Sequence, residues 1–197
     1  LIDRARFEAS ILGRPLTIQI DATESNALTK ELVEKADTVS VPAKNLLEFF
    51  DFRAELRHIG VDAPVLVRIE SAEAMDSLDL LASLGDGLII SRAALVKDAG
   101  WEKAPDFERK IHDLGNRLGK PTVLLGAPSN AGQAMNTDVY SSIYDRGADG
   151  IALDKEITSS KRAAESVERA AAVITAAEQA LAKAAFQPER VAPMLPK

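Results

Sequence analysis

Two side chains that could do chemistry stand at the end of one short apolar run. The run Val-Leu-Val-Arg-Ile-Glu occupies residues 65–70, with a cation at Arg68 and a carboxylate at Glu70. Side chains alternate between the two faces of a strand, so Arg68 and Glu70 are predicted to share one face near a strand end. Two interpretations stay open, a structural ion pair or a site in which Arg68 holds an anion.

Further carboxylates follow the ends of other apolar runs. Asp21 and Asp154 each end such a run, and Glu156 comes two residues after Asp154. Together with Glu70 these side chains could form a metal site, because divalent cations prefer carboxylate oxygens. Asp21 is expected two strands away from Glu70, and Asp154 three strands away. We therefore do not expect them to share one ion directly with Glu70.

Composition excludes several other kinds of chemistry and partner. There is no cysteine, which excludes disulfides, thiolate nucleophiles and thiolate metal sites. The net charge of −6 gives no electrostatic reason to expect nucleic acid as a partner. The apolar runs are too short to span a bilayer, so we expect no membrane insertion. We expect a soluble protein of the cytoplasm or of an organelle matrix or stroma. His58 and His112 have no ligand-spaced neighbour and are interpreted as surface or packing residues.

Six short aliphatic runs are predicted to be strands, and amphipathic stretches alternate with them. The runs occupy residues 16–21, 37–41, 65–70, 87–91, 122–127 and 150–154. Helices are predicted within 43–60 and 105–120, from apolar residues at helical spacing, and over the alanine-rich stretch 159–186. This alternation indicates βαβ units and a parallel sheet covered by helices. Six units fit either an open doubly wound sheet or six-eighths of an eight-stranded barrel, and periodicity alone does not choose.

The domain organisation is predicted to be simple. We expect one domain over residues 1–186, because no composition break interrupts it, and a proline-rich tail over 187–197. The first residue is Leu1, so we expect either that a leader was removed or that the chain is part of a longer product.

Five phrases, taken in order, resemble the barrel domain of pyruvate kinase from its third strand onward. They are GRPLTIQIDAT (13–23), TESNALTKELVEKADTVSVP (23–42), VLVRIESAEAMDSLDLLASLGDGLIISRAALV (65–96), LGKPTVLLGAP (118–128) and RGADGIALDKEIT (146–158). The resemblance implies a TIM-barrel-like (β/α) fold of the pyruvate kinase and phosphoenolpyruvate-binding type, with six βα units visible and the first two missing. It also implies that the family's lid domain is absent, since the phrase at 13–23 runs straight into the next helix.

The resemblance also implies where the family's chemistry would lie. Glu70 occupies the position of one glutamate metal ligand of the family, whereas Ala94 replaces the aspartate ligand and has no ligand atom. Arg68 replaces the catalytic lysine, keeping the charge but not the shape. Gly126 replaces a threonine and Asp154 a serine. Phosphoryl transfer needs cations and a metal held by carboxylates, so these positions imply a degenerate site in which no catalytic residue is expected.

Some features of the family's site survive as relics in this resemblance. Asp21 matches an aspartate that helps to hold a monovalent cation, and with Glu70 it is the candidate relic metal ligand. Arg68 is the candidate relic anion-binding residue. No cofactor is expected, although Mg²⁺ and K⁺ would be needed if the protein were active.

Two functions from different classes follow from these observations. The first is a non-catalytic pyruvate-kinase-like subunit with a structural or assembly role in a larger complex. The alternative is an enzyme of the same barrel class, either a phosphotransferase completed by a partner or a lyase acting on a small keto acid. Strands 16–21 and 150–154 would be open edges of an incomplete barrel, so we expect a protein partner or a second copy to cover them.

Overall fold

Six parallel strands form one sheet, and they follow one another across it in chain order. The computed structural model describes residues 17–20, 33–60, 62–126, 133–153 and 161–185, without the side chains of 133–137. The strands are β1 (Thr17–Gln19), β2 (Thr38–Ala43), β3 (Val65–Ile69), β4 (Gly87–Ser91), β5 (Thr122–Leu125) and β6 (Gly150–Ala152). A doubly wound sheet would reverse its strand order at a switch point, so the consecutive order is that of a barrel.

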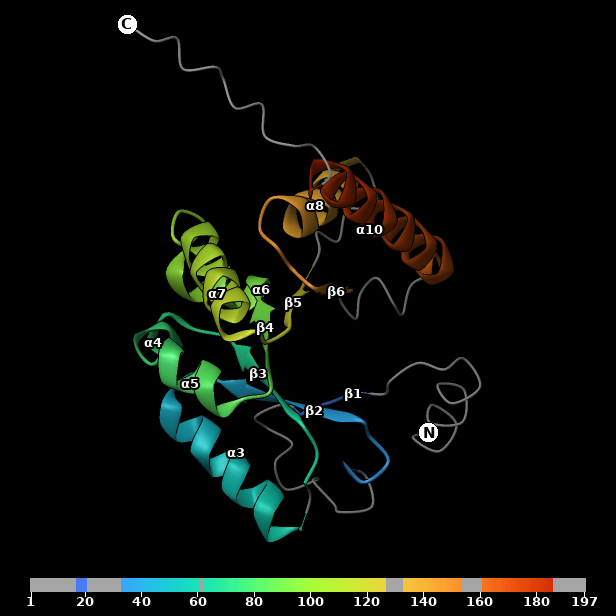
Figure 1. Ribbon diagram of the computed structural model, residues 1–197. Helices are drawn as coiled ribbons and strands as arrows, with labels where there is room; N and C mark the ends of the chain where they lie inside the picture. The colour runs from blue at the N-terminus through green and yellow to red at the C-terminus, as the bar shows by residue number, and fades with distance from the viewer. Residues whose placement is uncertain (1–16, 21–32, 61, 127–132, 154–160, 186–197) are drawn as a thin grey trace, which may run out of the picture.

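The sheet curls into a half-barrel, and the helices lie along the outside of the curl (Figure 1). They are α3 (Leu46–His58), α4 (Ala72–Asp76), α5 (Leu78–Leu84), α6 (Arg92–Ala99), α7 (Ala104–Leu118), α8 (Gln133–Tyr144) and α10 (Ala163–Ala185). The main core lies between these helices and the outer face of the sheet. Val41, Val67, Ile90 and Leu124 contribute fully buried side chains from the strands. None of the described helices is long and apolar enough to cross a membrane.

All six predicted strands are present, with small differences at their ends. The strand predicted over 87–91 has those bounds, because it is buried along its whole length. The second strand runs to Ala43, two residues beyond its predicted end. The predicted ends at Asp21 and Asp154 lie outside the described residues, as does the predicted tail over 187–197.

The sequence places Leu46, Leu47, Phe50 and Leu56 at helical spacing in α3, but the helix buries a different set of residues. Leu47 and Phe50 are 74% and 45% exposed, whereas Phe49, Phe52 and Leu56 are buried against the sheet. This helix has more apolar residues than one face holds, so helical spacing alone could not identify the buried stripe.

The residues that follow β4, including the position where the resemblance implied a metal ligand, form a helix. Helix α6 starts at Arg92, directly after the strand, and includes Ala93 and Ala94. Alanine is the strongest helix former, and glycine costs about 1 kcal/mol more in a helix interior. In the family phrase a glycine stands at the position of Ala93 and a second glycine at that of Val96, so the residues of this chain favour the helix.

The two longest of the described helices, α7 and α10, agree with the sequence pattern. Pro105 stands in the first turn of α7, and Gly119, with a φ of +64°, ends that helix in the left-handed conformation. Helix α10 lies within the predicted stretch 159–186 and packs on α8, with Ala170 and Ala177 buried in the contact.

Candidate functional site

Arg68 and Glu70 meet at the carboxyl end of β3. The Nε of Arg68 donates to Oε1 of Glu70 at 2.5 Å, and the two side chains are 3% and 17% exposed. A second guanidinium nitrogen of Arg68 donates to the carbonyl oxygen of Ile20 at 2.9 Å. The geometry is that of the structural ion pair, and it binds the arginine to its own sheet.

The contact with Ile20 has its origin in a proline within β2. Ile20 donates its N–H to the carbonyl of Ser40 at 2.9 Å, and in a parallel ladder the Ile20 carbonyl should then accept from residue 42. That residue is Pro42, which has no N–H to donate. Pro42 pairs with Arg68 in the register of β2 and β3. The guanidinium therefore reaches across the proline and supplies the missing donor.

Two of the positions where the resemblance places the family's chemistry, Ala94 and Gly126, carry no polar side-chain group in the described structure. Ala94 lies half-buried in the first turn of α6 and presents only a methyl group. Gly126 follows β5 with a φ of +95°, a conformation that favours glycine, and donates its N–H to the carbonyl of Ala152 at 3.2 Å. Gly126 thus has a local backbone reason to be glycine.

The described residues do not fit a divalent metal ion. An oxygen of Glu70 is engaged by Arg68, and Ala94 has no donor atom. Within the described part of the chain, no group of three or more histidine, aspartate or glutamate side chains could hold a metal. Asp21, Asp154 and Glu156 lie outside the described residues, so the metal hypothesis for them stays a prediction.

A second arginine at a strand end belongs to a charge network that the sequence did not reveal. Arg92 donates to Glu108 at 2.6 Å and also forms an ion pair with Asp138. Arg146 lies 3.4 Å from the same Glu108 oxygen and 3.7 Å from Asp138. Burial lowers the pKa of Arg92, but the two carboxylates outweigh this and raise it above its ordinary value. The network connects α6, α7 and α8. Its residues are far apart in the sequence, so no short sequence motif contains them.

His112 is fully buried between α7 and the sheet, whereas His58 is exposed. The Nδ1 of His112 lies 2.8 Å from the hydroxyl of Thr122, and this hydroxyl donates to Asp149 at 3.3 Å. Its Nε2 has no hydrogen-bond partner among the described residues. Burial lowers the pKa of His112, and the nearby charges of Glu108, Arg146, Asp149 and Arg92 partly offset one another. His112 is thus a packing residue held neutral by its surroundings.

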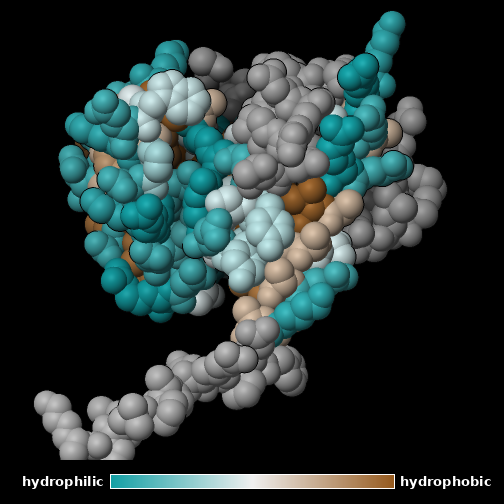
Figure 2. Space-filling view, turned by 90° about the horizontal axis from the view of Figure 1, so that it is seen from above, coloured by the Kyte–Doolittle hydropathy of each residue, from teal (hydrophilic) through white to brown (hydrophobic). Residues whose placement is uncertain are grey.

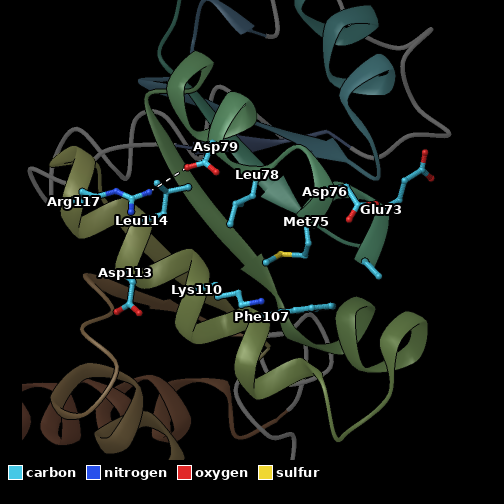
Figure 3. A pocket seen from close by; sticks show the side chains of 11 residues that line it. Glu73, Met75, Asp76, Leu78, Asp79, Phe107, Lys110, Asp113, Leu114 and Arg117 are labelled. Atoms are coloured by element: carbon cyan, nitrogen blue, oxygen red, sulfur yellow. Dashed lines mark hydrogen bonds and ion pairs between the residues drawn. The ribbon is translucent and has the colours of Figure 1, made fainter.

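A groove of about 760 Å³ lies on the helix layer, lined by α4, α5 and α7 (Figure 3). Met75, Leu78 and Phe107 form part of its apolar surface, and Arg117 pairs with Asp79 across it at 3.2 Å. Arg68 and Glu70 do not line it, so it is separate from the strand-end site.

Comparison with known proteins links the chain to pyruvate kinase. No protein-family model matches the sequence. The pyruvate kinase of Bacillus licheniformis is 27% identical over 131 residues, which cover 63% of this chain and 22% of that protein. The pyruvate kinase of Thermotoga maritima is 26% identical over 137 residues, 66% of this chain and 29% of that protein. The chain thus spans less than a third of the length of these relatives.

A solved structure supports the same relationship at the level of the fold. The crystal structure of pyruvate kinase from Pyrobaculum aerophilum matches with a TM-score of 0.68 and 22% sequence identity. The match covers 79% of this chain and 37% of that chain. In sequence and in fold, the chain is therefore similar to part of the pyruvate kinase barrel.

Proposed function

We propose that this pyruvate-kinase-like chain is a non-catalytic subunit with a structural or assembly role in a larger protein complex. The observation that carries the proposal is the state of Arg68, whose side chain is 3% exposed and bound to Glu70 and to the Ile20 carbonyl. A cation that serves phosphoryl transfer must be able to meet the phosphoryl oxygens.

Releasing Arg68 to a substrate would carry a cost at both of its contacts. Glu70 would lose its charged partner, and the Ile20 carbonyl would lose the donor that Pro42 cannot provide. Breaking a fully buried ion pair costs about 3–5 kcal/mol, and this pair should cost less because Glu70 is 17% exposed. Leaving a buried carbonyl unpaired costs about 1–3 kcal/mol. Phosphate binding would have to exceed these costs at a site where Ala94 offers no metal ligand.

The assembly part of the proposal is supported by the two ends of the sheet. Among the described residues, β1 pairs only with β2, and β6 pairs only with β5. Edge strands with unpaired backbone groups are sites at which other chains add strands. The half-barrel is therefore suited to being one part of a larger structure.

A coupled assay tests the non-catalytic part. The purified chain is given phosphoenolpyruvate, ADP, Mg²⁺ and K⁺, and a functional pyruvate kinase serves as the positive control. We expect no turnover above about 0.1 s⁻¹, a hundredth of the median enzyme value of about 10 s⁻¹. Ala94→Asp, alone or with Arg68→Lys, should not rescue activity, because such groups act as a unit. Turnover above this limit would refute the proposal and favour the phosphotransferase alternative.

The lyase alternative is tested separately with a small keto acid. The chain is incubated with oxaloacetate and Mg²⁺, and pyruvate release is compared with the rate in the absence of protein. We expect equal rates. A faster rate with the wild-type chain that is lost in Glu70→Gln would establish the lyase instead.

A further inference from the structure

The helix layer carries large apolar side chains that face away from the sheet. Leu47 and Phe50 of α3 and Leu80 of α5 are exposed. Helices α3, α5 and α7 belong to consecutive βα units, so they lie side by side on the outside of the curl (Figure 1). Large apolar residues that are exposed on adjacent helices are typical of an interaction surface.

The side of the molecule opposite α3 is less suited to binding a partner through apolar anchors. Seen from above, with α3 on the far side, it is largely hydrophilic apart from one stripe in tan and brown (Figure 2). In α10 the large exposed apolar residues are Val167 and Leu181, which lie about 21 Å apart along the helix. Helix α3 and its neighbours are therefore the favoured surface.

The exposed face of α3 carries cations on one side and carboxylates on the other. Residues that are three or four positions apart lie on the same side of a helix. Phe50, Arg53 and Arg57 therefore form one side of this face. Asp51 and Glu55 form the other. None of these four charged residues forms an ion pair with another described residue, so their charges are available to a partner.

The groove between α4, α5 and α7 has the complementary arrangement (Figure 3). Its floor is apolar, and the charged residues that α4 and α5 contribute to it are all carboxylates, Glu73, Asp76 and Asp79. Both cations of the lining, Lys110 and Arg117, come from α7, which also contributes one carboxylate. Arg117 already pairs with Asp79 at one end of the groove. Along the rest, Glu73, Asp76 and Lys110 form no ion pair with another described residue.

We propose that two copies of this chain form a dimer in which α3 of each copy lies in the groove of the other. Each helix runs antiparallel to the strands, so α3, α5 and α7 run in the same direction. A two-fold axis parallel to these helices, in front of α5, lays each α3 along the other groove and places Leu80 opposite its counterpart. This inference is independent of the proposed function, because neither α3 nor the groove contains Arg68, Glu70 or Ala94.

The charges of the two surfaces match in this arrangement. Seen from outside with the strands pointing up, right-handed connections place α3 on the left, α5 in the middle and α7 on the right. The right-handed winding of α3 then turns its arginine side toward the carboxylates of α4 and α5, and its carboxylate side toward α7. Arg53, in the middle of α3, comes close to the level of Asp76, at the end of α4. The lengths also agree, because α3 has 13 residues, about 20 Å, and α7 has 15, about 22 Å.

The first experiment measures the oligomeric state of the purified chain. Light scattering and sedimentation are recorded over a range of concentrations up to about 100 μM. We expect a discrete dimer whose dissociation constant rises with salt, because charges form part of the contact. A chain that stays monomeric at the highest concentration would overturn the inference. Particles that grow steadily with concentration would overturn the two-fold arrangement, because a closed two-fold contact stops at two copies.

Leu47→Glu tests the apolar contact. The new carboxylate lies in the first turn of α3, where the helix dipole favours a negative charge, so the fold should be kept. In the dimer the charge would be buried in the groove, and the dissociation constant should rise about tenfold or more. Leu181→Glu, the same substitution at an exposed leucine of α10, is the matched control and should leave the constant unchanged. An unchanged constant in Leu47→Glu, or a dimer lost only in Leu181→Glu, would overturn the proposed surface.

A pair of charge reversals tests which surfaces meet. Arg53→Glu and Asp76→Arg each place like charges opposite one another in both contacts of the dimer, so each variant alone should dissociate more readily by about tenfold. Mixing the two variants gives one native contact and one reversed but attractive contact. We therefore expect a heterodimer in the mixture, identified by the mass of a tag on one variant. Absence of the heterodimer, with both variants folded, would overturn the inference.

A single introduced thiol tests the position of the axis. The chain has no cysteine, so Leu80→Cys carries one thiol per copy, close to its counterpart in the proposed dimer. A disulfide requires Cα atoms within about 7 Å of each other. On oxidation with copper phenanthroline in air, we expect most of this variant to run as a covalent dimer. Ala172→Cys, at an exposed position of α10, is the control and should stay largely uncrosslinked. Equal crosslinking of the two variants would overturn the placement of the axis.

Discussion

Replacing Arg68 by methionine tests whether the guanidinium is a structural part of the sheet. The variant Arg68→Met keeps the unbranched stem but removes the 2.5 Å bond to Glu70 and the 2.9 Å bond to Ile20. The orphaned carbonyl should cost about 1–3 kcal/mol. The broken ion pair should cost less than the ~3–5 kcal/mol of a fully buried pair, because Glu70 is 17% exposed and can be hydrated. We expect a loss of about 3 kcal/mol in the free energy of unfolding.

The part of this loss that belongs to Ile20 can be isolated with a second substitution. In Pro42→Ala the new backbone N–H faces β1 and can donate to the Ile20 carbonyl. Arg68→Met should therefore cost about 1 kcal/mol less in the Pro42→Ala background than in the wild-type background. Removing a proline also makes the unfolded chain more flexible, so a matched control is needed. Pro64→Ala, at an exposed proline, provides this control. The cost of Arg68→Met should be the same with and without Pro64→Ala.

Urea denaturation at pH 7, followed by circular dichroism, measures all of these variants in one series. The coupling between residues 42 and 68 is the difference between the cost of Arg68→Met in the wild-type background and its cost in the Pro42→Ala background. A coupling below about 0.3 kcal/mol would refute the reasoning, because the effects of independent sites add to within that amount. A loss below about 1 kcal/mol in Arg68→Met alone would show that the pair does not stabilise the fold. The interpretation of Arg68 as a structural part of the sheet would then be wrong.

Three further predictions concern the packing around the site. Because burial lowers the pKa of His112, its contribution to stability is present above pH 6.5 and lost as the pH falls below that value, and the melting temperature of His112→Gln should lack this part of the pH dependence; an identical pH profile for the variant would contradict this. Gly115→Ala places a methyl group 2.2 Å from a threonine methyl and should cost about 1–3 kcal/mol, whereas Gly150→Ala, whose nearest neighbour is at 3.5 Å, should cost less than half as much; equal melting temperatures would refute the contrast. Glu108→Gln removes a buried charge shared by two arginines and should cost about 2 kcal/mol in urea denaturation, whereas Asp106→Asn breaks only an exposed pair and should cost about 0.5 kcal/mol or less; similar costs would contradict the role of the network.

The strands could be predicted from the sequence because burial leaves a direct signal in a covered parallel sheet. The run 87–91 is apolar on both faces, and it is buried along its whole length in the structure. The buried face of α3 could not be predicted in the same way. Leu47 and Phe50 are as apolar as Phe49 and Phe52, and only the packing of this helix against β2 and its neighbours selects between them.

The site was predictable only where its residues are close in sequence. The pair Arg68 and Glu70 follows from the two-residue period of a strand. The contact with Ile20 depends on the register of three strands, which no local pattern contains. The available signal was Pro42, directly after the apolar run 37–41, because a proline that joins a strand leaves a donor missing in the sheet. The network around Arg92 joins residues of three helices that are far apart in the sequence, so no local sequence pattern predicted it.

Both arginines at the strand ends keep the positive charge that an anion site would need, but each is neutralised by carboxylates of this chain. Arg68 is bound by Glu70, and Arg92 by Glu108 and Asp138. To bind Arg68 or Arg92, an incoming phosphate would have to compete with the carboxylates that these arginines already contact. The absence of a ligand atom at Ala94 and the contacts of Arg68 with Glu70 and Ile20 act in the same direction. In the described structure, both arginines make contacts that hold the half-barrel together.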